Sequence, residues 1–209
     1  MRLLLAGSTG LVGQHVLALA LTDPRVSEVV ALARRRLPAH PKLATRVVDF
    51  KDLPEQADWW RADAVICTLG TTMRAAGSRD AFQRVDKDYP LQVARLARQH
   101  GTAAYVLNSA MGASTSSRFF YNRVKGEVER ELASLGFRSL TIVRPGFIGG
   151  QRQERRPAEQ VAGMVLGLLA PVLPRRLRIN PAGRIAGVML NAAVAAAPGE
   201  RIVGAAELT

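Results

Sequence analysis

Near its start the chain reads Leu3-Leu4-Leu5-Ala6-Gly7-Ser8-Thr9-Gly10-Leu11-Val12-Gly13. Residues 3–6 form an apolar run of the kind that makes a buried parallel strand. Residues 11–21 have helical character, and this pattern stops at Asp23-Pro24. The stretch therefore predicts a strand, a tight turn and a helix in immediate succession, which is how a doubly wound α/β fold begins.

The turn between these two elements spaces its glycines as G-x-x-G-x-x-G. Gly7 permits a tight turn, Gly10 lets the backbone come close to a pyrophosphate, and Gly13 lets the helix pack against the strand. Free N–H groups and the helix dipole favour negative charge at such a helix start. We expect the turn to bind a dinucleotide, although a plain strand–helix turn without a ligand has the same local pattern.

Strand and helix patterns alternate along the rest of the chain. Strands are predicted at residues 26–33, 45–48, 64–69, 103–107 and 140–143, and helices at residues 90–100 and 117–135. This alternation predicts a doubly wound parallel Rossmann sheet with helices on both faces. We expect one domain over residues 1–209, in which residues 146–209 build a small substrate-side wall that includes a helix at 181–197 and a short strand at 201–203.

The end of the second predicted strand bears on the type of cofactor. The ribose ligand of a Rossmann domain comes about 20 residues beyond the last glycine of the turn, and an acidic residue there favours NAD. This chain has Arg34, Arg35 and Arg36 instead, and guanidinium groups suit a 2′-phosphate. We therefore favour NADP(H) over NAD(H), the alternative being that the arginines form a solvated loop. Asp49, which ends the third predicted strand, is placed to touch the adenine amino group.

Three further side chains suggest reductase chemistry. Tyr121 and Lys125 lie four residues apart on the long predicted helix, and therefore on one face of it. Ser109 follows the fifth predicted strand, so the three can meet at the carboxyl end of the sheet. We expect Tyr121 to pass a proton to a carbonyl oxygen, Lys125 to bring the pKa of that phenol toward neutrality, and Ser109 to bind the substrate oxygen. The alternative is an inert tyrosine beside a surface lysine.

The composition bounds the remaining functions. The formal net charge is +12, but no zinc-finger, helix-turn-helix or RNP-like pattern accompanies it, so we expect no specific nucleic-acid partner. One cysteine and three scattered histidines exclude an intramolecular disulfide and predict no metal site. We read no signal peptide in the first residues, and we expect a cytoplasmic location.

The motifs together resemble a known family. The chain is similar to atypical short-chain dehydrogenase/reductases, and within them to the Tat-interacting-protein-type oxidoreductases and their bacterial relatives. The resemblance is carried by Gly7-Ser8-Thr9-Gly10-Leu11-Val12-Gly13, Cys67-Thr68-Leu69-Gly70-Thr71-Thr72, Val85-Asp86-Lys87-Asp88-Tyr89, Ser109-Ala110-Met111-Gly112-Ala113, Phe120-Tyr121-Asn122-Arg123-Val124-Lys125-Gly126-Glu127-Val128-Glu129 and Arg144-Pro145-Gly146.

This resemblance implies a Rossmann fold, NADPH binding, and Ser109, Tyr121 and Lys125 in the reductase positions. A serine pair that relatives often carry reads Ser109-Ala110 here. The family also implies a second hypothesis, a non-catalytic NADPH sensor that acts through a partner. The predicted cofactor-binding residues are Gly7, Ser8, Thr9, Gly10, Leu11, Val12, Gly13, Arg34, Arg35, Asp49, Phe50, Leu69, Gly70, Thr71, Tyr121, Lys125 and Pro145.

The partners are less sharply defined by the sequence. Residues 161–173 are apolar, with Arg152, Arg155 and Arg156 before them and Arg175, Arg176 and Arg178 after them. They can be a lid over an apolar anionic substrate, a helix on an anionic membrane surface within residues 158–178, or a core helix with solvated ends. A sugar-nucleotide epimerase usually needs a larger substrate region than this chain has. We expect a small-molecule substrate and a monomer or homodimer.

Overall fold

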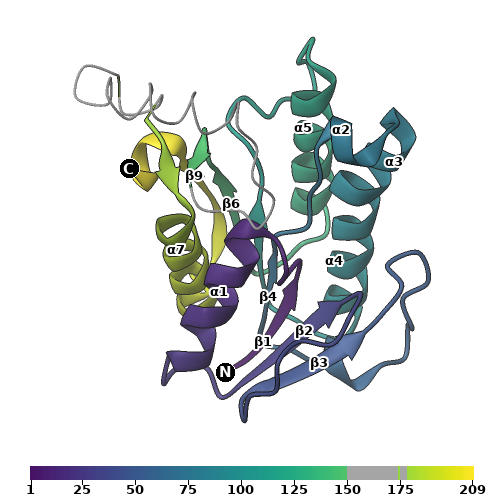
Figure 1. Cartoon of the computed structure of the whole chain (residues 1–209), viewed down its shortest axis with the longest axis vertical. Coiled ribbons are helices and arrows are strands. Elements are labelled where there is room, and N and C mark those ends of the chain that lie inside the picture. The colour runs from purple at the N-terminus through teal and green to yellow at the C-terminus, as the bar shows by residue number, and fades with distance from the viewer. Residues whose placement is uncertain (150–173, 175–177) are drawn as a thin grey trace.

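The computed structural model describes residues 1–149, 174 and 178–209. Its main sheet has seven strands, all parallel, in the order β3-β2-β1-β4-β5-β6-β9 (Figure 1). The first six follow the order of the doubly wound dinucleotide-binding fold, which reverses direction between β1 and β4. The strands are β1 (Arg2–Ala6), β2 (Glu28–Ala33), β3 (Leu43–Val47), β4 (Ala64–Cys67), β5 (Ala104–Asn108), β6 (Ser139–Arg144) and β9 (Gly199–Gly204).

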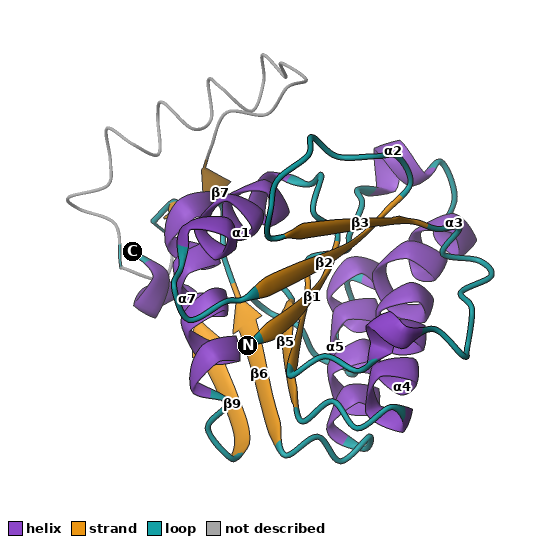
Figure 2. Cartoon of the chain, turned by 90° about the horizontal axis from the view of Figure 1, so that it is seen from below, coloured by secondary structure: helices purple, strands orange, loops and turns teal. Residues whose placement is uncertain are grey.

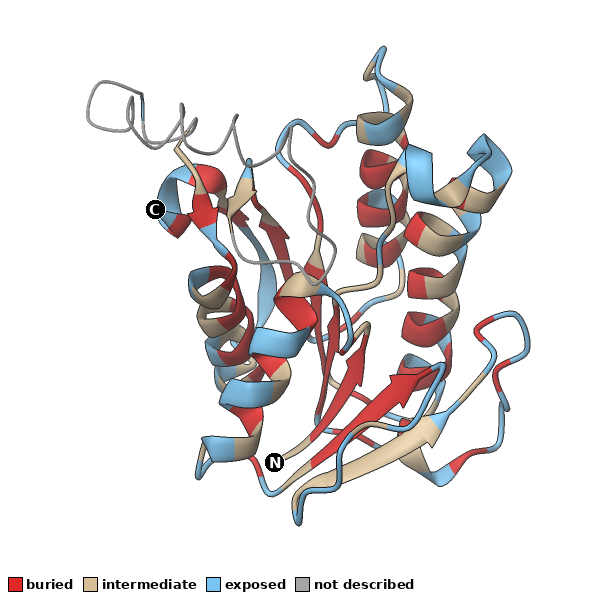
Figure 3. Cartoon of the chain, in the orientation of Figure 1, coloured by how far each residue is buried: buried red, intermediate tan, exposed pale blue. Residues whose placement is uncertain are grey.

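The two faces of this sheet are covered by different helices. Helices α1 (Leu11–Thr22) and α7 (Ala182–Ala195) lie on one face, and α4 (Tyr89–Gln99) and α5 (Phe120–Ala133) lie on the other (Figure 1). Successive residues of β1 point to opposite faces, so Leu3 packs with α1 and α7, whereas Leu4 packs in the cluster that includes α4 and α5. Figure 3 shows the central strands buried on both faces, as expected of a parallel sheet between helices. The predicted fold class is confirmed.

Short elements complete the described chain (Figure 2). A small parallel pair joins two segments that follow β6 and precede α7. Brief helices lie between β3 and β4, between β4 and α4, and after β9. These elements are η1 (Asp58–Trp60), α2 (Met73–Ala76), α3 (Arg79–Gln83), η2 (Arg84–Asp88), β7 (Ile148–Gly149), β8 (Asn180–Pro181) and η4 (Ala205–Leu208).

The helix that was predicted to begin at Pro90 begins eleven residues earlier, as α3, continues through η2, and then becomes α4. Proline has no N–H to donate to the carbonyl four residues before it, so the α-helical ladder cannot continue unchanged through Pro90. The N–H of Tyr89 donates to the carbonyl of Arg84, five residues back, and η2 is a π-helical turn. Such turns are often found at functional sites, and this one carries Asp86.

The C-terminal region differs from the predicted substrate-side wall. Within residues 146–209, α7 packs against the sheet beside α1, and β9 extends the main sheet next to β6. Both are therefore core elements. The predicted apolar segment at 161–173 lies outside the described residues, as do five of the six arginines around it. Within the described residues, no helix is long and apolar enough to cross a membrane.

Candidate functional site

Two glycines of the turn after β1 are required by close packing. Gly7 has a φ of +93°, which L side chains rarely adopt, and a Cβ atom on it would lie 2.6 Å from the carbonyl carbon of Thr68. A Cβ atom on Gly13 would lie 2.1 Å from the carbonyl oxygen of Gly7. These two residues therefore serve the tight turn and the close contact between helix and strand, as the sequence predicts.

Gly10 and its neighbours leave room for an anion. A Cβ atom on Gly10 would meet only the Gly7 carbonyl oxygen, at 3.4 Å, so the fold itself has space there. No side chain caps the N-terminus of α1, and its first turn holds no acidic residue. The hydroxyl of Ser8 is buried and has no hydrogen-bond partner among the described residues. An uncapped helix start and an unpaired buried hydroxyl fit the phosphates of a dinucleotide.

A cavity of about 680 Å³ opens beside this turn. It lies where the strand order reverses, between the carboxyl ends of β1 and β4, which is where doubly wound sheets bind their ligands. It brings together the turn from Gly7 to Gly13, here called the phosphate turn, and all three predicted catalytic residues. Its lining residues are Thr9, Gly10, Leu11, Val12, Gln14, Thr68, Leu69, Gly70, Thr71, Thr72, Met73, Ala75, Asp86, Asn108, Ser109, Tyr121, Lys125 and Ile148.

Helix α5 turns a polar stripe toward this cavity. Tyr121, Lys125 and Glu129 follow one another at intervals of four residues, and Lys125 and Glu129 are buried. The helix comes close to the preceding loop because Gly126 has no side chain, since a Cβ atom there would lie 2.3 Å from the carbonyl carbon of Ser114. The apolar stripe of Val124, Val128 and Leu132 packs into the core beside it.

Lys125 forms a buried ion pair that the sequence did not predict. Its Nζ lies 2.8 Å from Oδ1 of Asp86, and both side chains are almost completely buried. The other oxygen of Asp86 accepts a hydrogen bond from the backbone N–H of Thr71, at 2.7 Å. Burial acts to lower the pKa of Lys125, but its interactions with charged and polar neighbours, chiefly the carboxylate of Asp86, outweigh burial and raise that pKa. Lys125 is therefore a cation held in place.

Ser109 also has a carboxylate partner. Its hydroxyl donates a short hydrogen bond to Oε1 of Glu129. Glu129 in turn accepts two hydrogen bonds from Arg144, from Nε at 3.1 Å and from Nη2 at 2.5 Å. A fork of this kind fixes a carboxylate in both position and orientation. The hydrogen of the Ser109 hydroxyl thus points toward Glu129, and its lone pairs remain for a ligand.

The pKa of Tyr121 corrects one expectation. Burial raises this pKa above its usual value, and although Lys125 acts to lower it, Asp86 acts to raise it. The net direction is upward, whereas the sequence analysis expected Lys125 to bring the phenol toward neutrality. Burial of the phenol and the charge of Asp86 together outweigh the effect of the lysine. In the protein as described, the phenol of Tyr121 is protonated at neutral pH.

The predicted cofactor residues fall into two groups. Thr9 to Val12, Leu69 to Thr71, Tyr121 and Lys125 line the cavity, whereas the others do not. Phe50 is a core residue, with its ring 5.8 Å from that of Tyr89. Asp49 is exposed and accepts a hydrogen bond from the N–H of Lys51. Arg34 and Arg35 are exposed just after β2, and Pro145 accepts a hydrogen bond from the N–H of Met111 through its carbonyl oxygen.

Sequence reasoning missed Asp86, Asn108 and Glu129. Asn108 ends β5 and lines the cavity, and its side-chain oxygen is buried without a hydrogen-bond partner among the described residues. Glu129 continues the four-residue spacing of Tyr121 and Lys125, so the helical period alone could have found it. Asp86 lies in a segment that carries the family resemblance, but no local pattern shows its role, because that role depends on a π-helical turn and on a contact between distant segments.

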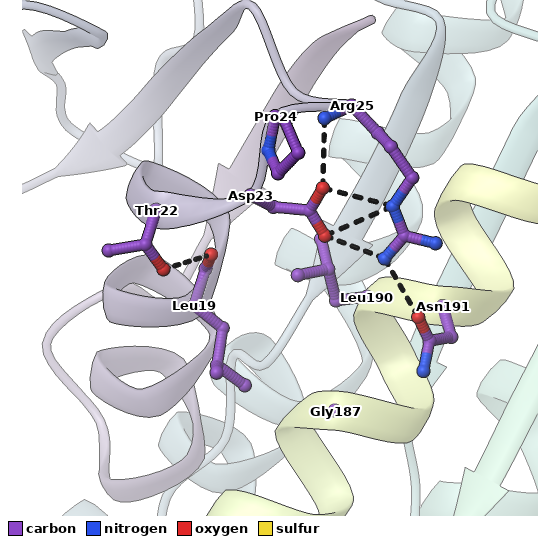
Figure 4. A pocket seen from close by; sticks show the side chains of 8 residues that line it. All are labelled: Leu19, Thr22, Asp23, Pro24, Arg25, Gly187, Leu190 and Asn191. Carbon is purple, nitrogen blue, oxygen red and sulfur yellow. Dashed lines mark hydrogen bonds and ion pairs between the residues drawn. The ribbon is translucent and has the colours of Figure 1, made fainter.

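A second, smaller cavity of about 340 Å³ lies at the opposite end of α1, against α7 (Figure 4). Asp23, Arg25 and Asn191 line it, and Figure 4 shows them joined to one another by hydrogen bonds. Its polar side chains are thus already satisfied within the protein. It shares no lining residue with the cavity beside the phosphate turn. The described residues contain no cluster of side chains that could hold a metal ion.

Residues 7–163 match a protein-family model described as NAD(P)H-binding. The chain belongs to this NAD(P)H-binding family. The match begins at the first glycine of the turn after β1, and it runs through every residue that lines the cavity. The chain is therefore an NAD(P)-binding protein with an oxidoreductase-like fold, and its cofactor is a nicotinamide dinucleotide.

Relatives of this NAD(P)H-binding protein come from fungi and animals. It is 39% identical over 176 residues to the mitochondrial protein fmp52 of Emericella nidulans, covering 80% of this chain and 76% of the relative. It is 40% identical over 168 residues to the protein HTATIP2 of Rattus norvegicus, covering 78% and 69%. The expectation of a cytoplasmic location is overturned, because fmp52 relatives are named mitochondrial.

Solved structures share the fold at lower identity. MoeE5 in complex with UDP-glucose and NAD has a TM-score of 0.73 and 16% identity, covering 98% of this chain and 76% of that chain. The reductase domain of PhqB from Penicillium fellutanum has a TM-score of 0.70 and 20% identity, covering 97% and 65%. Identities at this level show the fold alone, and those ligands belong to those proteins.

Proposed function

We propose that this protein is an NADPH-dependent oxidoreductase of the short-chain dehydrogenase type that reduces a small carbonyl compound. The observation that carries the proposal is the shared cavity. Ser109, Tyr121 and Lys125 line the same space as the uncapped start of α1, so a dinucleotide held there extends toward all three. Bound NADPH supplies a hydride to the carbonyl carbon, and the protein must supply a proton to the oxygen.

Tyr121 is the proposed proton donor. Its raised pKa keeps the phenol protonated at neutral pH, which is the form that reduction requires. The O–H bond of Tyr121 breaks, the proton joins the carbonyl oxygen, and water returns a proton to the phenolate after the product leaves. Ser109 offers its lone pairs, and the side chain of Asn108 offers an unpaired oxygen, to orient the ligand in the cavity.

We further propose NADP(H) rather than NAD(H) as the cofactor. Leu32 in β2 pairs with Ala6 in β1, so Arg34 and Arg35 leave the sheet next to the phosphate turn. Both are exposed, and neither forms an ion pair with another of the described residues. Guanidinium groups at this place suit a ribose 2′-phosphate.

A second candidate function is NADPH sensing without turnover. It is favoured by two contacts, the ion pair between Lys125 and Asp86 and the hydrogen bond from Ser109 to Glu129. These contacts occupy two of the three proposed catalytic residues with other protein groups. Both functions need the dinucleotide, but only the enzyme needs the phenol. NADPH oxidation should therefore be followed across a panel of aldehydes and ketones, with the wild-type protein and with Tyr121→Phe. Turnover that disappears in the variant supports the enzyme, whereas equal NADPH oxidation by both proteins removes Tyr121 from the mechanism.

A further inference from the structure

Asp86 connects two parts of the cavity that are far apart in the sequence. Its Oδ1 contacts Nζ of Lys125 on α5 at 2.8 Å, and its Oδ2 accepts the N–H of Thr71 in the loop after β4 at 2.7 Å. The side chain of Asp86 is 1% exposed. The two oxygens thus bind a catalytic-site cation and the backbone beside the phosphate turn at the same time.

We propose that Asp86 is a positioning residue that holds Lys125 against the loop at Thr71 and opposes the effect of the lysine's positive charge on Tyr121, which favours the protonated phenol that reduction requires. This inference rests on the proposed function and deepens it, because it adds a residue and a direction of reaction. Asp86 lines the cavity, but its two oxygens are engaged by Lys125 and by the backbone of Thr71. It acts through Lys125 and through its own charge.

The charges around Tyr121 support this role. The charge of Lys125 acts on the phenol from the same helix, and the charge of Asp86 acts on it from η2. The thiol of Cys67, on β4, is the further titratable group beside Lys125, and burial raises its pKa, so it is neutral at neutral pH. Lys125 favours the phenolate and Asp86 opposes it. Without the carboxylate, only the burial of the phenol would oppose the effect of the cation on the pKa of Tyr121.

The geometry around the carboxylate is close enough to transmit its position. A Cβ atom on Gly70 would lie 3.3 Å from Oδ1 of Asp86 and 3.9 Å from Nζ of Lys125. The loop backbone at Gly70, the carboxylate and the ammonium group therefore lie close together, and Lys125 and Thr71 are both bonded to the carboxylate. A displacement of any one of them moves the others, which is how a buried residue outside the reaction can position a group inside it.

The test is an ultraviolet titration of Tyr121 in the free protein, without cofactor or substrate. Phenolate absorbance is followed against pH, and the same titration of Tyr121→Phe is subtracted so that Tyr89 and Tyr105 cancel. We expect Asp86→Asn to lower the midpoint for Tyr121 by about one pH unit. Asp88→Asn is the matched control, because Asp88 lies in the same turn η2 but is exposed, and it should leave the midpoint in place. An unchanged or higher midpoint in Asp86→Asn would overturn the proposal.

A second comparison covers the case in which Asp86→Asn does not fold, because it leaves Lys125 buried without its partner. Lys125→Met and the double variant Asp86→Asn/Lys125→Met are then titrated in the same way. The double variant removes both buried charges. Its midpoint for Tyr121 should lie below that of Lys125→Met, since the remaining carboxylate opposes the phenolate in the single variant. Equal midpoints would overturn the proposal.

These titrations separate this inference from the proposed function. They report a charge effect even in a protein that never oxidises NADPH. If turnover is found, the pH above which carbonyl reduction declines should also fall by about one unit in Asp86→Asn, and it should not change in Asp88→Asn. A shifted titration without any turnover would contradict the enzyme but leave the role of Asp86 in place.

Discussion

A Cβ atom on Gly13 would lie 2.1 Å from the carbonyl oxygen of Gly7, whereas one on Gly10 would lie 3.4 Å from the same atom. The same turn therefore contains one glycine that the fold needs and one that it has room to replace. This contrast separates packing from ligand binding, and the first two predictions use it.

Gly13→Ala should destabilise the protein. The added methyl group overlaps the Gly7 carbonyl oxygen and also lies 2.7 Å from Oγ1 of Thr68, so α1 must move away from the sheet. Overpacking of this kind costs about 3 kcal/mol. Urea denaturation followed by circular dichroism measures the loss. A variant as stable as the wild type would show that α1 does not approach β1 this closely.

Gly10→Ala should fold almost normally but bind the dinucleotide poorly. The φ of Gly10 is −75°, which alanine adopts readily, and the change at a helix N-cap costs about 1 kcal/mol or less. The methyl group would occupy the space beside the uncapped start of α1. The dissociation constant for NADPH should rise at least about tenfold, since the phosphates can no longer approach the backbone. Binding at wild-type strength would mean that the phosphates lie elsewhere.

Arg34→Gln/Arg35→Gln should change the preference between cofactors. Each lost charge-assisted hydrogen bond to a 2′-phosphate costs about 1.5–3 kcal/mol, so NADPH binding should weaken about tenfold or more. NADH lacks that phosphate, and its binding should not change. Both are measured by fluorescence titration. Equal losses for the two nucleotides would contradict the assignment of NADP(H).

Glu129→Gln should destabilise the protein more than Ser109→Ala. The first change removes the carboxylate that accepts two hydrogen bonds from Arg144. We expect it to lower the free energy of unfolding by about 2 kcal/mol. The second removes one hydroxyl and leaves the pair of Glu129 and Arg144 intact, at a cost of about 1 kcal/mol. Chemical denaturation of both variants measures the difference. If Ser109→Ala is the more damaging change, Glu129 does not anchor this corner of the site.

Tyr121→Phe should reduce turnover about 10²- to 10⁴-fold while NADPH binding stays the same. The phenyl ring keeps its packing against Phe82, whose ring lies 5.7 Å away, so the fold should not change. Stopped-flow or steady-state NADPH oxidation with an active carbonyl substrate measures the loss. A matched binding titration shows that the cofactor is still held. Retained turnover would leave the sensor as the better account.

Much of the fold follows from local patterns in the sequence. The apolar runs predicted all seven strands of the main sheet, and Gly7, Gly10 and Gly13 placed the ligand site before any contact was known. The sequence failed where distant segments decide the outcome. The helix predicted at residues 90–100 is α4, but the helical residues before it were missed, because nothing local shows that a π-helical turn lets a helix run through Pro90. Phe50 was predicted to bind the cofactor, but it is a buried core residue whose ring packs against that of Tyr89.

The same limit applies to the site. The spacing of Tyr121 and Lys125 shows that they share a helix face, but it does not show that Asp86 neutralises the lysine. The predicted pKa of Tyr121 therefore had the wrong direction, because burial of the phenol and the charge of Asp86 together outweigh the charge of Lys125. A carboxylate brought in by tertiary structure changes the chemistry of a motif whose sequence is intact.

The most direct test of this account is a fluorescence titration of the purified full chain with NADPH and with NADH. Binding of a nicotinamide dinucleotide at the turn from Gly7 to Gly13 underlies the proposed enzyme, the sensor and the direction of reaction alike. We predict saturable binding of both nucleotides, with NADPH bound about tenfold more tightly than NADH. Failure of the protein to bind either nucleotide would contradict the account.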